Sequence, residues 1–110
     1  KKIELALPGT NKKLNNAEVW LGRNTVIDPK AILQGKILIG NNVIIKENVD
    51  LSGHVILGDN CVIESGAKIQ DSIIWSASNI GTKAKITNTI IGLNSQVPAS
   101  GELKVPVFVG

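Results

Sequence analysis

Aliphatic residues recur at every sixth position along most of the chain. From Leu21 onward, nine successive positions at this spacing are Ile or Leu, namely Leu21, Ile27, Leu33, Ile39, Ile45, Leu51, Leu57, Ile63 and Ile69. The residues two places earlier are small or β-branched, namely Val19, Thr25, Ala31, Ile37, Val43, Val49, Val55, Cys61 and Ala67. Two inward side chains around one outward side chain give the period-two alternation of a β-strand. Each six-residue unit therefore predicts a short strand followed by a corner.

The predicted corners are rich in residues that tolerate a positive φ. They include Gly22-Arg23-Asn24, Gly40-Asn41-Asn42 and Gly58-Asp59-Asn60, and Gly, Asn and Asp adopt the left-handed conformation at low cost. An α-helix is excluded because a period of six does not match about 3.6 residues per turn. Three units make a triangular coil of about 18 residues, so the pattern predicts an all-β, single-stranded parallel β-helix of about five coils.

The six-residue spacing shortens to five at two places. These are the steps from Ile69 to Ile74 and from Ile86 to Ile91. The two short units end alike, in Ser72-Ile73-Ile74 and Thr89-Ile90-Ile91, so that a small hydroxyl residue takes the inner position. We expect each deletion to fall in a corner and to leave the inward register intact.

The outward positions distinguish three faces, because every third unit returns to the same face. On the first face the outward residues are Trp20, Leu38, Ile56, Ile73, Ile90 and Phe108. The residue two positions after each of them is Gly, except that Trp75 follows Ile73. The second face changes from apolar to polar along the chain, and the third carries charged residues. A contiguous apolar patch of several hundred Å² is seldom left bare. The pattern predicts an interface with a second copy or another domain, formed by Trp20, Leu38, Ile56, Ile73, Trp75, Ile90 and Phe108; ordinary β-propensity is the alternative.

Composition and charge limit the kinds of partner that the chain is expected to bind, and they distinguish its N-terminal segment from the rest. Residues 1–24 carry the whole net charge of +3, and residues 25–110 sum to zero. With 3% aromatic residues and no basic stripe, the chain is not expected to bind nucleic acid. No apolar run is long enough to span a membrane, and the single cysteine excludes an internal disulfide, so we expect a cytoplasmic setting. Residues 1–18 are interpreted as a linker or lead-in, and residues 19–110 as the β-helix domain.

Residues capable of chemistry are few. His54 is the only histidine and is expected at a surface corner, while Cys61 takes a small inward position and is expected to be a buried filler. The carboxylates are scattered without a pair spaced for acid–base work. We therefore assign no catalytic, cofactor-binding or metal-binding residue to this chain.

The repeat from residue 19 to about 97 resembles the hexapeptide-repeat superfamily, which implies a left-handed helix. A finer likeness rests on four segments: the lead-in from Ile3 to Gly9 with its Pro-Gly, Val19-Trp20-Leu21-Gly22-Arg23-Asn24, Asp71-Ser72-Ile73-Ile74-Trp75 and Asn88-Thr89-Ile90-Ile91-Gly92. These segments resemble the C-terminal β-helix of sugar-1-phosphate nucleotidyltransferases (NDP-sugar pyrophosphorylases), of the mannose-1-phosphate guanylyltransferase-like and glucose-1-phosphate nucleotidyltransferase-like kinds.

The resemblance implies a non-catalytic domain, because those enzymes carry their active site in an N-terminal nucleotide-binding domain. Their β-helix mediates oligomer contacts and sometimes regulation, so the implied partners are further copies or the catalytic domain. The chain would then be a fragment or a free-standing relative of such an enzyme. Two alternatives remain open: a hexapeptide-repeat acyltransferase, which typically has a catalytic histidine, an excursion loop and a C-terminal helix, and a purely structural scaffold.

Overall fold

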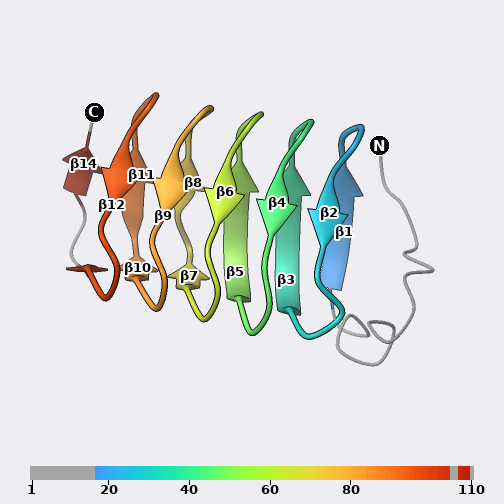
Figure 1. The fold of residues 1–110 in the computed structure, drawn as a ribbon, viewed down its shortest axis with the longest axis horizontal. Coiled ribbons are helices and arrows are strands. Elements are labelled where there is room, and N and C mark those ends of the chain that lie inside the picture. The colour runs from blue at the N-terminus through green and yellow to red at the C-terminus, as the bar shows by residue number, and fades with distance from the viewer. Residues whose placement is uncertain (1–16, 105–106, 110) are drawn as a thin grey trace.

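The computed structural model describes residues 17–104 and 107–109, which form a parallel β-solenoid without a helix (Figure 1). The strands are β1 (Ala17–Leu21), β2 (Val26–Ile27), β3 (Ile32–Ile39), β4 (Ile44–Ile45), β5 (Asp50–Leu57), β6 (Val62–Ile63), β7 (Lys68–Gln70), β8 (Ile73–Ile74), β9 (Asn79–Ile80), β10 (Lys85–Thr87), β11 (Thr89–Ile91), β12 (Gln96–Val97), β13 (Glu102–Leu103) and β14 (Val107–Val109). Every strand pair is parallel, as expected when one chain winds repeatedly in the same direction.

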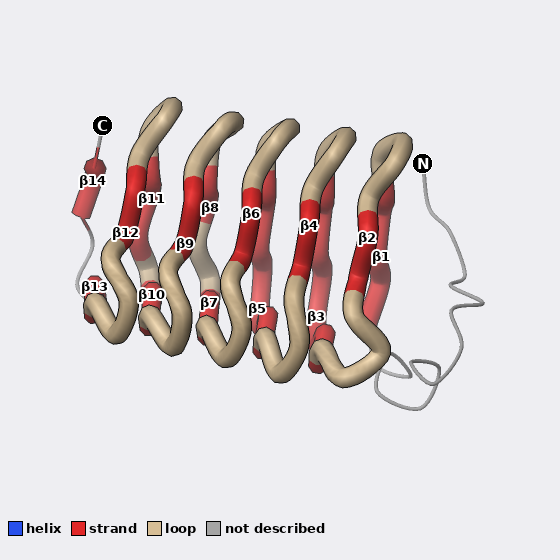
Figure 2. The backbone as a smooth tube through the Cα atoms, in the orientation of Figure 1, coloured by secondary structure: helices blue, strands red, loops and turns tan. Residues whose placement is uncertain are grey.

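The winding repeats about five times, as the six-residue spacing predicts. The second face is the five-stranded sheet β2-β4-β6-β9-β12, and each of its strands belongs to a different turn (Figure 2). The first and third faces form one nine-stranded sheet, because β3 and β5 run without interruption through the corner between them. The predicted β-helix is therefore confirmed, and the arrangement is consistent with the left-handed winding that the resemblance implies.

The inward positions build a single aliphatic core. The inward Ile, Leu and Val residues from Ile27 to Val97 are all buried, and most of them have no exposed surface at all. Burying each such side chain contributes on the order of 1.5–3 kcal/mol. Leu21 and Leu103 are only partly buried, because among the described residues the first and last coils have a neighbouring coil on one side only.

Positive φ angles mark the corners, but not always at the expected residue types. Asn24, Asn42, Asn60 and Asn94 form one corner column with φ between 55° and 60°. In the same column Ala77 has a φ of 61°. Its N–H donates to the carbonyl oxygen of Asp59 in the previous coil at 2.8 Å, so the stacked coils impose a turn that the side chain does not favour.

The two five-residue units shorten the corner between the third and first faces. Ser52 pairs with Gln70, but Ile56 pairs with Ile73, so one residue is missing between these two pairs. The Ser72 hydroxyl donates to the Gln70 carbonyl at 2.8 Å, and its oxygen accepts the Thr89 N–H at 3.1 Å. The expected corner deletion is thus confirmed, and the buried hydroxyl satisfies the tightened backbone.

The predicted lead-in, residues 1–18, lies almost entirely outside the described residues. Only its last part is observed, where β1 begins at Ala17. The boundary between residues 18 and 19 therefore remains a prediction. Within the described residues, no helix is long and apolar enough to cross a membrane.

Candidate docking surface

Six of the predicted interface residues lie in one column on the first face. The strand register pairs Trp20 with Leu38, Leu38 with Ile56, Ile56 with Ile73, and Ile73 with Ile90. The backbone of β14 continues the column by pairing Phe108 with Ile90. Parallel pairing without slippage keeps these outward positions about 4.8 Å apart. Residues spread over most of the chain thus form one continuous apolar row.

The side chains of this row are exposed to a degree that is unusual for their type. The exposed fractions are 44% for Leu38, 40% for Ile56 and 39% for Ile90. Trp20 and Ile73 are half-buried. Because inward and outward residues alternate, each of these side chains points away from a neighbour that is almost fully buried. The side chains of this row therefore cannot be buried in the core of the same chain.

Trp75 widens the row at the fourth coil. Its position is occupied by Gly22, Gly40, Gly58 and Gly92 in other coils, and its side chain is 47% exposed. Beside it lies Leu93, which is 57% exposed. Trp75 and Leu93 line a shallow groove of about 220 Å³ with Ile56, Gly58 and Ile73.

Leu93 was not among the interface residues predicted from the sequence, although the sequence contains a pattern that indicates it. Aligning the corners places it in one column with Arg23, Asn41, Asp59 and Ser76, and it is the only apolar member. In earlier coils this column forms a ladder: Asn41 Oδ1 accepts the Arg23 N–H at 2.7 Å, and Asp59 Oδ1 accepts the Asn41 N–H at 2.7 Å. A leucine cannot continue the ladder, so its side chain adds to the apolar surface instead.

The N-terminal half of the row is flat because glycine follows each strand. A Cβ on Gly40 would overlap the Asp59 carboxylate, and one on Gly22 would overlap the Asn41 side chain. Here Trp20 and Leu38 line a groove of about 330 Å³ together with Leu21, Gly22, Ile39, Gly40 and Leu57. The lining contains no charged residue.

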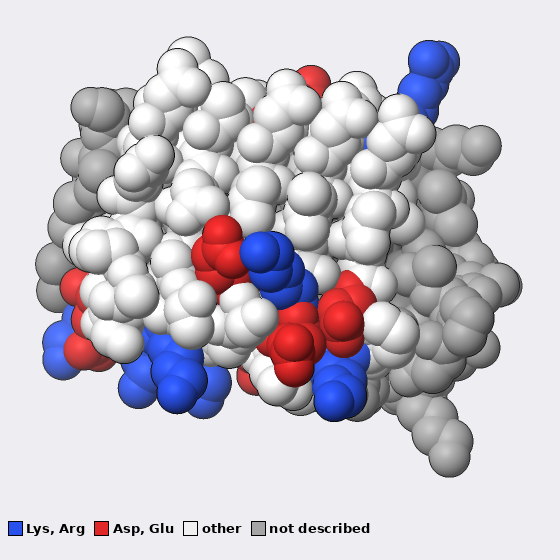
Figure 3. All heavy atoms as spheres, viewed as in Figure 1, with Lys and Arg blue, Asp and Glu red and all other residues white. Residues whose placement is uncertain are grey.

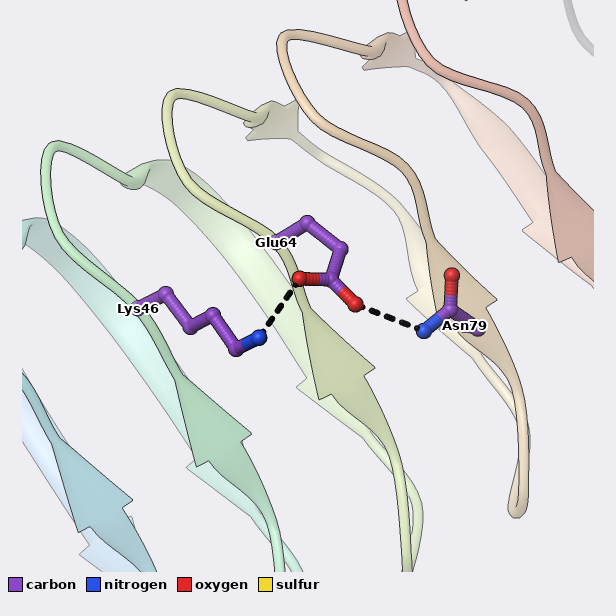
Figure 4. A network of polar contacts seen from close by, with 3 residues as sticks. All are labelled: Lys46, Glu64 and Asn79. Carbon is purple, nitrogen blue, oxygen red and sulfur yellow. Dashed lines mark hydrogen bonds and ion pairs between the residues drawn. The ribbon is translucent and has the colours of Figure 1, made fainter.

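The second face carries a polar network of three side chains, Lys46, Glu64 and Asn79. Lys46 Nζ lies 2.8 Å from Glu64 Oε1, and Asn79 Nδ2 donates to Glu64 Oε2 at 3.0 Å (Figure 4). Most of the charged side chains visible on this face gather on its middle and lower parts, and only isolated ones stand at its upper edge (Figure 3). The network links three successive coils across the sheet.

We expect this network to make stability depend on pH. The hydrogen bond from Lys46, and next that from Asn79, lowers the pKa of Glu64. A carboxyl whose pKa is lower in the folded chain stabilises the fold above the unfolded pKa of about 4.3, and this contribution disappears as the pH falls through the folded pKa. Glu64→Gln should therefore cost about 0.2–1 kcal/mol at neutral pH, as for other surface ion pairs, and less at about pH 3, which lies below the unfolded pKa.

Urea denaturation at both pH values measures this difference. Glu102→Gln is the control, since Glu102 Oε2 lies 3.9 Å from Lys104 Nζ in a much more exposed pair. An equal loss for Glu64→Gln at the two pH values would contradict the assigned pKa shift.

His54 and Cys61 lie apart from each other and in different surroundings. His54 is exposed within β5, beside the bend at Gly53, and its backbone N–H donates to Asp71 Oδ1 at 3.1 Å. Cys61 is buried as expected, and burial raises the pKa of its thiol. Its Sγ donates to the Trp75 carbonyl at 3.2 Å. Within residues 17–104 and 107–109, no three His, Cys, Asp or Glu side chains gather as a metal site.

The fold and its surface define the class to which the chain belongs: a parallel β-solenoid domain with an exposed apolar column on one face. Residues 33–110 match the family model described as the GMPPB C-terminal domain, and the chain belongs to this family, that of the mannose-1-phosphate guanylyltransferases. This match confirms the resemblance to the C-terminal domain of a sugar nucleotidyltransferase. No curated protein matches the chain.

Proposed function

We propose that this domain has no catalytic role of its own, and that its first face docks it onto the catalytic domain of the same sugar nucleotidyltransferase. The observation that carries the proposal is the exposed apolar column from Trp20 to Ile90, widened by Trp75 and Leu93. Aromatic anchors in an apolar surround are typical of residues that contribute most to protein interfaces.

The size of the surface favours a tethered partner over a second copy. The column from Trp20 to Ile90 extends over about 19 Å and, at a width of about 12 Å, offers on the order of 230 Å². A stable interface between separate proteins buries about 800 Å² on each partner. A partner on the same polypeptide needs less area, because the linker supplies a high effective concentration.

Acrylamide quenching of Trp75 fluorescence tests the proposal. A Trp20→Phe background leaves Trp75 as the only tryptophan of these 110 residues, and every tryptophan of the catalytic domain is replaced by Phe in the intact enzyme. We expect free quenching in the isolated chain, where Trp75 is 47% exposed, and several-fold weaker quenching in the intact enzyme that contains the domain. Ile56→Lys in the intact enzyme should restore quenching, because it buries a charge in the apolar contact.

The matched control is Gln70→Lys, which introduces the same charge at an exposed residue of β7 on the third face. It should leave the quenching of the intact enzyme unchanged. Equal quenching of Trp75 in the chain and in the enzyme would refute docking through this face. Shielding that instead grows with the concentration of the isolated chain would identify a second copy as the partner and overturn the assignment to the catalytic domain.

A further inference from the structure

A polar groove lies on the third face, where β7 and β10 follow each other in successive coils. Lys68 pairs in register with Lys85, and Gln70 pairs with Thr87. The isoleucine between them on each strand is buried, so the outward side chains stand in two rows with strand backbone between the rows. This space is a groove of about 250 Å³, lined by Asp50, Ser52, Lys68, Ile69, Gln70, Lys85, Ile86 and Thr87.

Lys68 and Lys85 place two like charges side by side in this groove. Neighbouring positions on paired strands are about 4.8 Å apart, and like charges directly opposite each other destabilise a sheet. Neither ammonium group forms an ion pair with another described residue. An anion bound between the two lysines would replace their repulsion by attraction, because it can accept a charge-assisted hydrogen bond from each of them.

The charge of the chain around this pair is positive. Between residues 65 and 101 the only charged side chains are those of Lys68, Lys83, Lys85 and Asp71. The Asp71 carboxylate already accepts the backbone N–H of His54 at 3.1 Å. Basic side chains gather at the lower edge of the C-terminal half of the molecule (Figure 3). The groove therefore lies in a positive part of a domain whose charges balance over residues 25–110 as a whole.

The uncharged polar groups of the groove can also bind an anion. The Gln70 amide and the Thr87 hydroxyl line it, and only the backbone carbonyls of these two residues are engaged by Ser72 and Thr89. We propose that the groove binds a phosphoryl group, with the ammonium groups of Lys68 and Lys85 and the side chains of Gln70 and Thr87 donating to its oxygens. A phosphoryl dianion suits this arrangement because it offers three strong acceptor oxygens that point in different directions.

Asp50 opposes an anion at one end of the groove. It pairs in register with Lys68 on the side away from Lys85, so the phosphoryl group is placed towards Lys85 and Thr87. Asp50→Asn should tighten binding about two- to threefold, as expected when one partly exposed charge is removed. The inference does not depend on the proposed function, because the groove lies on the third face and the docking surface on the first.

Titration of the full chain with inorganic phosphate, followed by amide NMR at constant ionic strength and about pH 7.5, tests the inference. We expect saturable shifts of the amide signals of Lys68, Gln70, Lys85 and Thr87 at millimolar phosphate, because exposed charges are screened by solvent and salt. Lys85→Gln should weaken binding about fivefold or more. The matched control is Lys36→Gln, which removes the same charge from an exposed position of β3 and should leave the affinity unchanged.

Methyl phosphate distinguishes the two sources of a phosphoryl group. Binding of methyl phosphate that is as tight as that of inorganic phosphate, or tighter, would identify a phosphate monoester as the ligand class, and weaker binding would identify free phosphate. Shifts that grow with phosphate concentration without saturating would overturn the inference. An equal loss of affinity for Lys85→Gln and Lys36→Gln would overturn it as well, because the effect would then come from net charge and not from the groove.

Discussion

Replacing Leu51 by Ala is expected to lower the free energy of unfolding by about 2–5 kcal/mol. Leu51 has no exposed surface and pairs with Leu33 in the coil before it and with Ile69 in the coil after it. Neighbouring coils hold the backbone at a fixed spacing, so the core cannot collapse into the space that the side chain leaves. The loss should therefore include a cavity contribution in addition to the lost transfer free energy. Urea denaturation followed by circular dichroism measures it.

Leu103→Ala is the matched control for this change. It removes the same atoms from the same face, but Leu103 is only partly buried and belongs to the last coil. We expect roughly half the loss seen at Leu51, because stability in a solenoid is a sum over neighbouring repeats. Equal losses at the two positions would contradict this nearest-neighbour description of the core.

Gly35→Ala is expected to destabilise the fold by about 3 kcal/mol or more, a large part of the 5–15 kcal/mol typical of a domain. Gly35 has a φ of +96°, and an added Cβ would overlap the backbone carbonyl oxygen of Gly53 in the next coil. Both the conformation and the contact are therefore unfavourable. Relief would require the two coils to separate at the corner through which β3 and β5 run continuously.

Gly66→Ala separates the two contributions. Its φ of +75° carries a similar conformational strain, but the nearest atom to an added Cβ is Lys83 Cγ at 3.1 Å, in a flexible side chain. This variant should lose only about 1–2 kcal/mol. Thermal unfolding of the two variants provides the comparison, and a loss at Gly66 as large as at Gly35 would rule out the carbonyl overlap as the cause.

The sequence could predict the fold because one physical constraint repeats in every coil. An inward position must be aliphatic or small to fill a narrow triangular core. Leu33, Leu51 and Ile69 occupy equivalent positions in three successive coils, so the same residue type recurs at each of them. The shortened corners were predictable for the same reason, since only a register change keeps Ile74 and Ile91 inside. The apolar column followed from counting outward residues on that frame, whereas its role as an interface remains a prediction.

Other features depend on neighbours in space and were not predictable from residue type. Lys83 and Ser100 have φ angles of 61° and 59°, although neither residue favours that conformation. Their N–H groups donate to the carbonyls of Ser65 and Thr82 in the preceding coils, which fixes the turn from outside. Leu93 was overlooked because its corner column was not compared between coils, and its importance comes from lying beside Trp75.

The fixed spacing of the coils also sets a geometric requirement for any partner that docks on the first face as proposed. Neighbouring anchors of the column from Trp20 to Ile90 repeat every 4.8 Å or so, whereas an α-helix laid along them repeats every 5.4 Å or so. A helix would drift by about 0.6 Å per coil and be about 2.4 Å out of step after four coils. A stack of β-strands keeps the same interval throughout, so the surface discriminates between partners by periodicity as well as by hydrophobicity.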